Sequence, residues 1–162
     1  MNIWTERLER RHLSMLERWI GRADSALTAN DLPAEAGALR DWFENAQAEP
    51  GRLDCLALVY ETPVGVTGIV PCAGREGTAA LYLLLGERNY NPLRTATYVS
   101  LRMLDRAFGE LGLTRVETRV GAEHGWFLDA LERMGFSRGE EREDRICLAV
   151  EKARFLDRKY LF

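Results

Sequence analysis

Residues 53–85, which read LDCLALVYETPVGVTGIVPCAGREGTAALYLLL, decide the fold of this chain. They contain three apolar runs, at 53–60, 64–70 and 78–85, and each run has the length of a strand and is rich in residues that favour strands. The first two runs flank Glu61-Thr62-Pro63 and the last two flank a turn at 74–77, so consecutive runs are predicted to pair as hairpins. The sequence therefore predicts an antiparallel meander of three strands.

Segments with helical periodicity flank this meander. Before it, 10–20 and the stretch that follows Pro33 both carry apolar residues at spacings of three and four, and 21–30 is predicted to be a loop. A short strand is expected ahead of the first helix, and the second helix is expected to stop before Glu49-Pro50-Gly51. After the meander the sequence predicts, in order, a helix at 95–111, a strand at 115–120, a helix at 125–134 and strands at 136–141 and 145–150.

This order of elements predicts the fold class. A meander followed by a strand-helix-strand crossover and a closing hairpin gives an α/β fold with one mixed, mostly antiparallel central sheet and helices on both faces. The 162 residues match the size of one domain, so the whole of 1–162 is expected to be a single domain.

Composition excludes several classes of protein. The 22 Lys and Arg residues stand against 25 Asp and Glu, which gives a net charge of −3 and argues against a protein that coats nucleic acid or anionic membranes. Three distant cysteines and two histidines give neither a disulfide framework nor a metal site. The charged N-terminus is unlike a signal peptide, and no apolar run reaches the ~20 residues of a membrane span, so a cytoplasmic protein is expected.

Several segments resemble the GNAT superfamily of acyl-CoA-dependent N-acyltransferases. Pro63-Val64-Gly65-Val66-Thr67-Gly68-Ile69-Val70 is similar to its glycine-containing strand, and Glu132-Arg133-Met134-Gly135-Phe136 to its C-terminal signature. Residues 85–91 and the helix after them match the register of its cofactor-binding strand, loop and helix. The opening, 8–19, resembles the branch that includes ribosomal-protein N-acetyltransferases. The resemblance covers nearly the whole chain and implies a GNAT-like fold.

The resemblance also implies a site for acetyl-CoA as acyl donor. The backbone of Leu83, Leu84 and Leu85 would hold the pantetheine arm. The family's pyrophosphate pattern falls on residues Asn91, Pro92, Leu93, Arg94, Thr95, Ala96 and Thr97, of which Ala96 alone matches it. Arg94 replaces a glycine and either adds a charge-assisted contact to phosphate or fills the cradle, while Pro92 removes one N–H donor. At the start of the next helix, His124 and Phe127 complete the expected cofactor site.

Three residues are candidates for catalysis, each with a structural alternative. Glu117 is predicted to face the incoming amine as a base, or else to form an ion pair on a strand end. Tyr82 either lines the acceptor cleft as a proton donor or is a core tyrosine with its hydroxyl at the edge. His124 either acts as a base near neutral pH or is simply the residue at which a helix starts. The tyrosine that often serves as general acid in the family is replaced by Leu131.

Two functions are therefore carried forward. The first is an N-acyltransferase that moves an acetyl or related acyl group from acyl-CoA to a primary amine of a small molecule or peptide by direct attack. The second is a GNAT-like domain without catalysis that acts as a binding or assembly module. Large apolar side chains in 155–162 are expected to dock on the domain or on a second copy, which makes a homodimer an open expectation.

Overall fold

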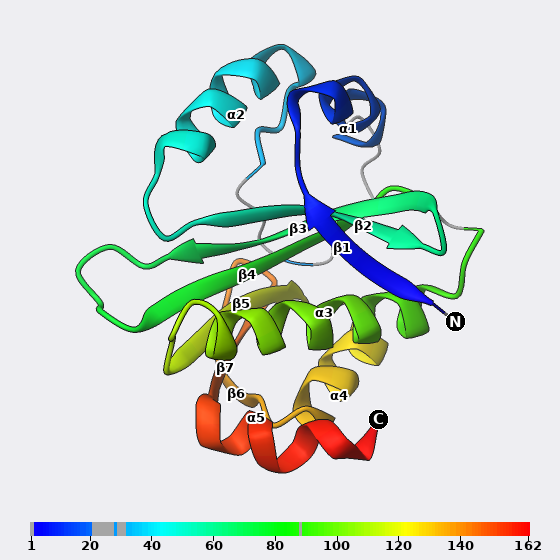
Figure 1. The fold of residues 1–162 in the computed structure, drawn as a ribbon. Helices are drawn as coiled ribbons and strands as arrows, with labels where there is room; N and C mark the ends of the chain where they lie inside the picture. The colour runs from blue at the N-terminus through cyan, green and yellow to red at the C-terminus, as the bar shows by residue number, and fades with distance from the viewer. Residues whose placement is uncertain (1, 21–27, 29–31, 88) are drawn as a thin grey trace.

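The computed structural model describes residues 2–20, 28, 32–87 and 89–162 (Figure 1). The strands are β1 (Ile3–Arg7), β2 (Leu53–Val59), β3 (Thr62–Pro71), β4 (Thr78–Leu85), β5 (Arg115–Gly121), β6 (Ser137–Arg142) and β7 (Arg145–Glu151). The helices are α1 (Leu13–Ile20), α2 (Leu39–Ala48), α3 (Pro92–Gly109), α4 (Gly125–Arg133) and α5 (Lys152–Arg158). Short 3-10 turns lie at η1 (Arg10–His12), η2 (Ala36–Ala38) and η3 (Lys159–Leu161).

The strands of the described chain form one sheet in the order β1-β2-β3-β4-β5-β7-β6. Every neighbouring pair is antiparallel except β4 and β5, which are parallel because α3 carries the chain back between them. The predicted meander, crossover and closing hairpin are all present. The predicted mixed, mostly antiparallel α/β sheet is thus confirmed.

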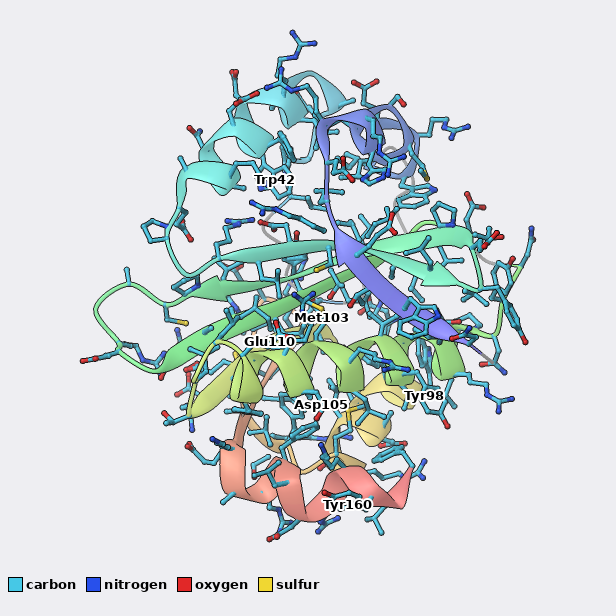
Figure 2. All side chains as sticks on the ribbon, in the orientation of Figure 1. Trp42, Tyr98, Met103, Asp105, Glu110 and Tyr160 are labelled. Atoms are coloured by element: carbon cyan, nitrogen blue, oxygen red, sulfur yellow. The ribbon has the colours of Figure 1, made fainter. Side chains whose placement is uncertain are left out.

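Helices cover both faces of this sheet, as predicted. Figure 1 shows α1 and α2 above one face, and α3, α4 and α5 below the other. The larger hydrophobic cluster lies on the α3 side, where Met103 points from α3 toward the sheet (Figure 2). The second cluster packs α1 and α2 against β2, β3 and β4 around Trp19 and Phe43. On the face that α1 and α2 cover, no helix of the described chain lies over β5, β7 or β6.

Two glycines explain why the quoted β3 motif fits beside β4. A Cβ on Gly65 would stand 2.4 Å from the carbonyl oxygen of Leu84, and one on Gly68 would stand 2.5 Å from the ring of Tyr82. Both distances are too short for a side-chain carbon. The glycines therefore let β4 and its tyrosine approach β3 closely.

Several boundaries differ from the sequence-based expectation. The first predicted helix is split into η1 and α1. Helix α3 begins at Pro92, three residues before the expected start, because the Asn91 side chain caps it and proline is tolerated in a first turn. Helix α5 has no counterpart in the prediction; its Phe155 packs on Phe108 of α3, with ring centroids 5.5 Å apart. The predicted loop at 21–30 lies outside the described residues, apart from Thr28.

The C-terminal segment docks only in part. Phe155 is buried, whereas Leu156, Tyr160 and Leu161 are exposed, and Figure 2 shows Tyr160 on the outer side of the C-terminal segment. The expectation of a homodimer therefore stays a prediction. In the described residues no helix is long and apolar enough to cross a membrane, and no group of three metal-binding side chains gathers.

Candidate functional site at the parting of β4 and β5

The one parallel pair of strands separates halfway along its length. The register of β4 and β5 runs from Thr78 opposite Arg115 to Ala80 opposite Glu117 and then stops. One step further, the Thr118 hydroxyl donates to the carbonyl of Leu81 at 2.9 Å. Beyond that point β4 and β5 no longer pair with each other, and each leads toward the start of a helix, α3 after β4 and α4 after β5.

Thr28 lies in this parting. Its backbone forms an isolated antiparallel bridge with Val120 of β5, and its side-chain oxygen accepts a hydrogen bond of 2.9 Å from the amide of Leu83 in β4. Thr28 is 1% exposed, so the contact is shielded from water. One amide of the backbone stretch predicted to hold pantetheine therefore already has a partner.

A pocket of about 290 Å³ opens at the far end of the parting, between the starts of α3 and α4. We call it the helix-start pocket. It is lined by Leu85, Glu87, Asn91, Pro92, Leu93, His124 and Trp126. The structure thus brings together five of the predicted site residues, which come from the end of β4 and the starts of two helices.

The start of α3 is largely capped by its own residues. The amide of Arg94 donates to the Asn91 side chain at 3.0 Å, and the amide of Thr95 donates to the Asn91 carbonyl. Pro92 has no N–H. Within the part of the chain that the structure describes, Leu93 is left as the amide donor of this first turn. The helix N-terminus therefore offers an anion fewer donors than an uncapped start would.

Two lining residues of the helix-start pocket were missed at the sequence level. Trp126 lies beside His124, with ring centroids 6.0 Å apart in an edge-on arrangement. Glu87 lies two residues after the end of β4 and accepts a hydrogen bond of 3.1 Å from the indole of Trp19. The sequence signal for Glu87 was its position between Leu85 and Asn91, and the signal for Trp126 was its position two residues after His124. An aromatic ring and a carboxylate thus join the residues expected to hold an acyl donor.

Other predicted cofactor residues point elsewhere. Thr95, Ala96 and Thr97 are buried under the first turns of α3, and Phe127 is buried in the larger hydrophobic cluster. These side chains lie on the inner side of their helices and face the core. They therefore do not line the helix-start pocket. Arg94, by contrast, is exposed at the start of α3.

Glu117 lies on the opposite face of the sheet from α3. Arg75 donates to it at 3.2 Å, and Arg115 Nε lies 3.5 Å from its carboxylate. The hydrogen bond from Arg75 holds the pKa of Glu117 below its usual range, although partial burial acts in the other direction. A carboxylate held in this way is a poor proton acceptor, so the structure favours the ion-pair alternative for Glu117.

This side of the sheet is hollowed around Glu117. One hollow of about 250 Å³ lies at the near end of the parting, beside Ala80, Leu81 and Thr118. An adjoining hollow of about 430 Å³ extends over β7 and β6, and the two share Glu117, Cys147 and Leu148. We call the pair of hollows the sheet-face groove.

Tyr82 faces the covered part of the sheet. Its hydroxyl donates to Asp54 at 2.5 Å, and Arg52 binds the same carboxylate at 2.8 and 3.0 Å. Tyr82 is 2% exposed and lies in the cluster under α1 and α2. The prediction that it lines an acceptor cleft is therefore corrected: the packing of α1 and α2 makes it a core tyrosine whose hydroxyl is held by a buried carboxylate.

Comparison with known proteins identifies the fold. No family model matches the sequence, and no curated protein matches it. A spermidine N-acetyltransferase from Vibrio cholerae, solved in complex with CoA and spermine, is 13% identical at a TM-score of 0.79, over 95% of this chain and 98% of that one. A chimera of that enzyme is 14% identical at a TM-score of 0.81, over 98% and 100%. An uncharacterised protein from Bacillus halodurans is 12% identical at a TM-score of 0.77, over 96% and 87%. The chain therefore has the fold of the GNAT superfamily of N-acetyltransferases, as its sequence motifs predicted.

Proposed function

We propose that the protein is an N-acyltransferase that moves an acyl group from acyl-CoA to a primary amine by direct attack. The observation that carries this proposal is the position of two openings along the parting. The helix-start pocket lies at Leu85 and His124, and the sheet-face groove lies at Leu81 and Thr118. Leu83 and Val120 lie between them on the two strands. Two substrates that enter from opposite ends would meet there.

The residues of the helix-start pocket suit an acyl-CoA. The pocket is mainly apolar, with Leu85, Leu93 and Trp126 for a pantetheine arm, and Arg94 is an exposed cation beside it for phosphate. The remaining amide of Leu93 adds a donor at the positive end of α3. When bound, acyl-CoA would supply the thioester that the amine attacks. Support also comes from the fold, since the Vibrio cholerae enzyme of the same fold was solved with CoA and spermine.

The chain's own groups have separate tasks in this proposal. The Thr28 side chain accepts the hydrogen bond of the Leu83 amide, so Thr28 lies at the position where the two substrates would meet. Glu117, paired with Arg75 and Arg115, stays ionised and keeps both guanidinium groups at the acceptor end. We assign the departing thiolate no protein proton donor, because Leu131 stands where the family often has tyrosine and Tyr82 is bound to Asp54.

A second function is favoured by two observations. The capped start of α3, with Pro92 in it, and the Thr28 contact on Leu83 both remove donors that an acyl-CoA would use. A GNAT-like domain that binds a partner without acyl transfer would tolerate both losses. Binding of the acyl donor separates the two functions.

The decisive experiment is a calorimetric titration with acetyl-CoA, CoA and adenosine 3′,5′-bisphosphate. Micromolar binding, about −8 kcal/mol, is expected for acetyl-CoA. Arg94→Gln should weaken it about tenfold or more, because the charge-assisted contact to phosphate is lost. Arg40→Gln, an exposed arginine on α2, is the matched control and should change nothing. No heat and no thermal shift with any of the three compounds would reject acyl transfer and leave the binding module.

A further inference from the structure

The floor of the sheet-face groove is built mainly from small side chains. The register places Glu117 of β5 opposite Ala149 of β7, and Ala149 opposite Ser137 of β6. The next row places Arg119 opposite Cys147. Ala80, Cys147, Ala149, Ser137 and Gly139 thus line the hollow where larger side chains would fill it. No helix of the described chain covers this floor.

The rim of the groove is positively charged, although the whole protein carries a net charge of −3. Its described lining contains the five arginines Arg75, Arg115, Arg119, Arg138 and Arg154 and the two glutamates Glu117 and Glu151. Both glutamates are already bound by arginines, through Arg75 to Glu117 and Arg115 to Glu151 at 2.6 Å. Among the described residues, Arg119 and Arg154 have no ion-pair partner. The free charges of the groove are therefore cationic.

We propose that the sheet-face groove binds a peptide whose free amino group is followed by acidic side chains. This proposal rests on the proposed function for the role of the amino group, which would reach the parting at Ala80 and Thr118. Arg119, the unpaired arginine nearest the parting, would bind the first acidic side chain, and Arg154 one further along. An amine acceptor with several positive charges, such as a polyamine, would meet the same arginines and be repelled.

The size of the groove fits a short extended peptide. It reaches from β4 across β5 and β7 to β6, which is three strand spacings or about 14 Å. An extended chain advances about 3.4 Å per residue, so this length holds about four residues. The arginine side chains of the groove can form bidentate hydrogen bonds with carboxylates. This geometry favours Asp and Glu over other hydrogen-bond acceptors.

Fluorescence anisotropy with C-terminally labelled tetrapeptides tests this proposal on the full chain. The probes are Ala-Glu-Glu-Gly, Ala-Gln-Gln-Gly and Ala-Lys-Lys-Gly, all with free amino termini, and a single-stranded oligonucleotide is included. We expect the acidic peptide to bind about tenfold tighter than the neutral one, and more weakly at high salt. Arg119→Gln should weaken it severalfold and Arg119→Glu should reverse the preference, whereas Arg40→Gln should not change it.

The outcomes separate this proposal from the proposed function. Equal binding of all three peptides, a preference for the lysine peptide, or tighter binding of the oligonucleotide would overturn the acidic-peptide site. Thiol release from acetyl-CoA is measured in parallel with the same peptides. Binding that depends on Arg119 but gives no thiol release would reject acyl transfer and keep the acidic-peptide site. Thiol release without a preference for the acidic peptide would keep acyl transfer and reject the acidic-peptide site.

Discussion

The two halves of the central sheet are built differently. In the half that contains β2, β3 and β4, helices cover both faces, and most of these three strands is buried. In the half that contains β5, β7 and β6, helices cover one face, and all six residues of β6 are exposed. The covered half holds its polar groups in closed contacts, as in Arg52, Asp54 and Tyr82. The open half presents unpaired arginines around the sheet-face groove, on the face that no described helix covers.

Cysteine labelling tests this contrast with the largest expected effect. Cys55, on the α3 side of the covered half, is 0% exposed, and burial raises the pKa of its thiol to about 11. Cys147 lies in the sheet-face groove of the open half. At pH 8 a thiol reagent should modify Cys147 in the folded protein, whereas Cys55 reacts only through opening, more than ~10³-fold slower. Labelling rates followed by mass spectrometry measure the ratio, and similar rates would contradict the contrast.

Removal of the buried carboxylate in the covered half should cost the most stability. Asp54→Ala removes the carboxylate that accepts two hydrogen bonds from the buried guanidinium of Arg52, so the free energy of unfolding should fall by about 3–5 kcal/mol. Figure 2 shows Trp42 between α2 and the sheet, and the Arg52 guanidinium lies 5.3 Å from its ring centroid. Urea denaturation measures the loss. Tyr82→Phe, which removes one hydrogen bond, should cost about 1 kcal/mol; equal losses in both variants would be evidence against a dominant role of Asp54.

A smaller loss is expected from crowding between β4 and α1. A Cβ on Gly86 would stand 2.0 Å from the ring of Trp19, so Gly86→Ala should displace α1 and destabilise the fold by about 1–3 kcal/mol. Tryptophan fluorescence should shift to the red as Trp19 meets water. Gly109→Ala is the matched control, because a Cβ there meets nothing within 4 Å, and it should be neutral or slightly stabilising. Unchanged fluorescence and stability in Gly86→Ala would show that α1 adapts.

The smallest effect is expected at the ion pairs of the open half. Because the pKa of Glu117 is lowered in the folded state, its pairing stabilises the protein above the unfolded pKa of about 4.5 and this contribution is lost as the pH falls through the lower folded value. Glu117→Gln should therefore be slightly less stable than the wild type at pH 7, and the difference should disappear in strong acid. Thermal melts across pH 3–7 measure it. A large loss at pH 7, or an acidic limb of turnover that disappears with the variant, would point to a role beyond the ion pair.

The fold was largely predictable from local sequence signals. Strand β4 was predicted without error, and β2, β3, β5 and α4 within two residues at each end, because period, turn residues and breakers specify them locally. Helix α5 was missed because one side chain, Phe155, holds it against the core, which leaves almost no periodic pattern. The start of α3 was misplaced because its cap depends on the conformation of Asn91, which the residue type alone does not state.

The candidate site was predictable only where it follows the backbone path. Asn91, Pro92, Leu93 and His124 line the helix-start pocket, since the ends of β4 and β5 lead there in any sheet of this order, and their role in holding a cofactor stays a prediction. Phe127 and Thr95 were assigned to the site although the rotation of their helices turns them inward. Trp126 and Glu87 were missed for the same reason, because one residue along a helix or loop changes the side that a side chain faces.

The sequence by itself determined the order of elements, the mixed sheet and the superfamily fold, because these depend on periodicity, turn residues and motifs that are local in the chain. The tertiary structure decided which side chains meet. It placed Thr28 on the amide of Leu83, enclosed Tyr82 with Asp54, and gathered arginines from two strands, a loop and a helix around the sheet-face groove. Such contacts join residues tens of positions apart, and their distances and charges are set by packing and register rather than by any local pattern.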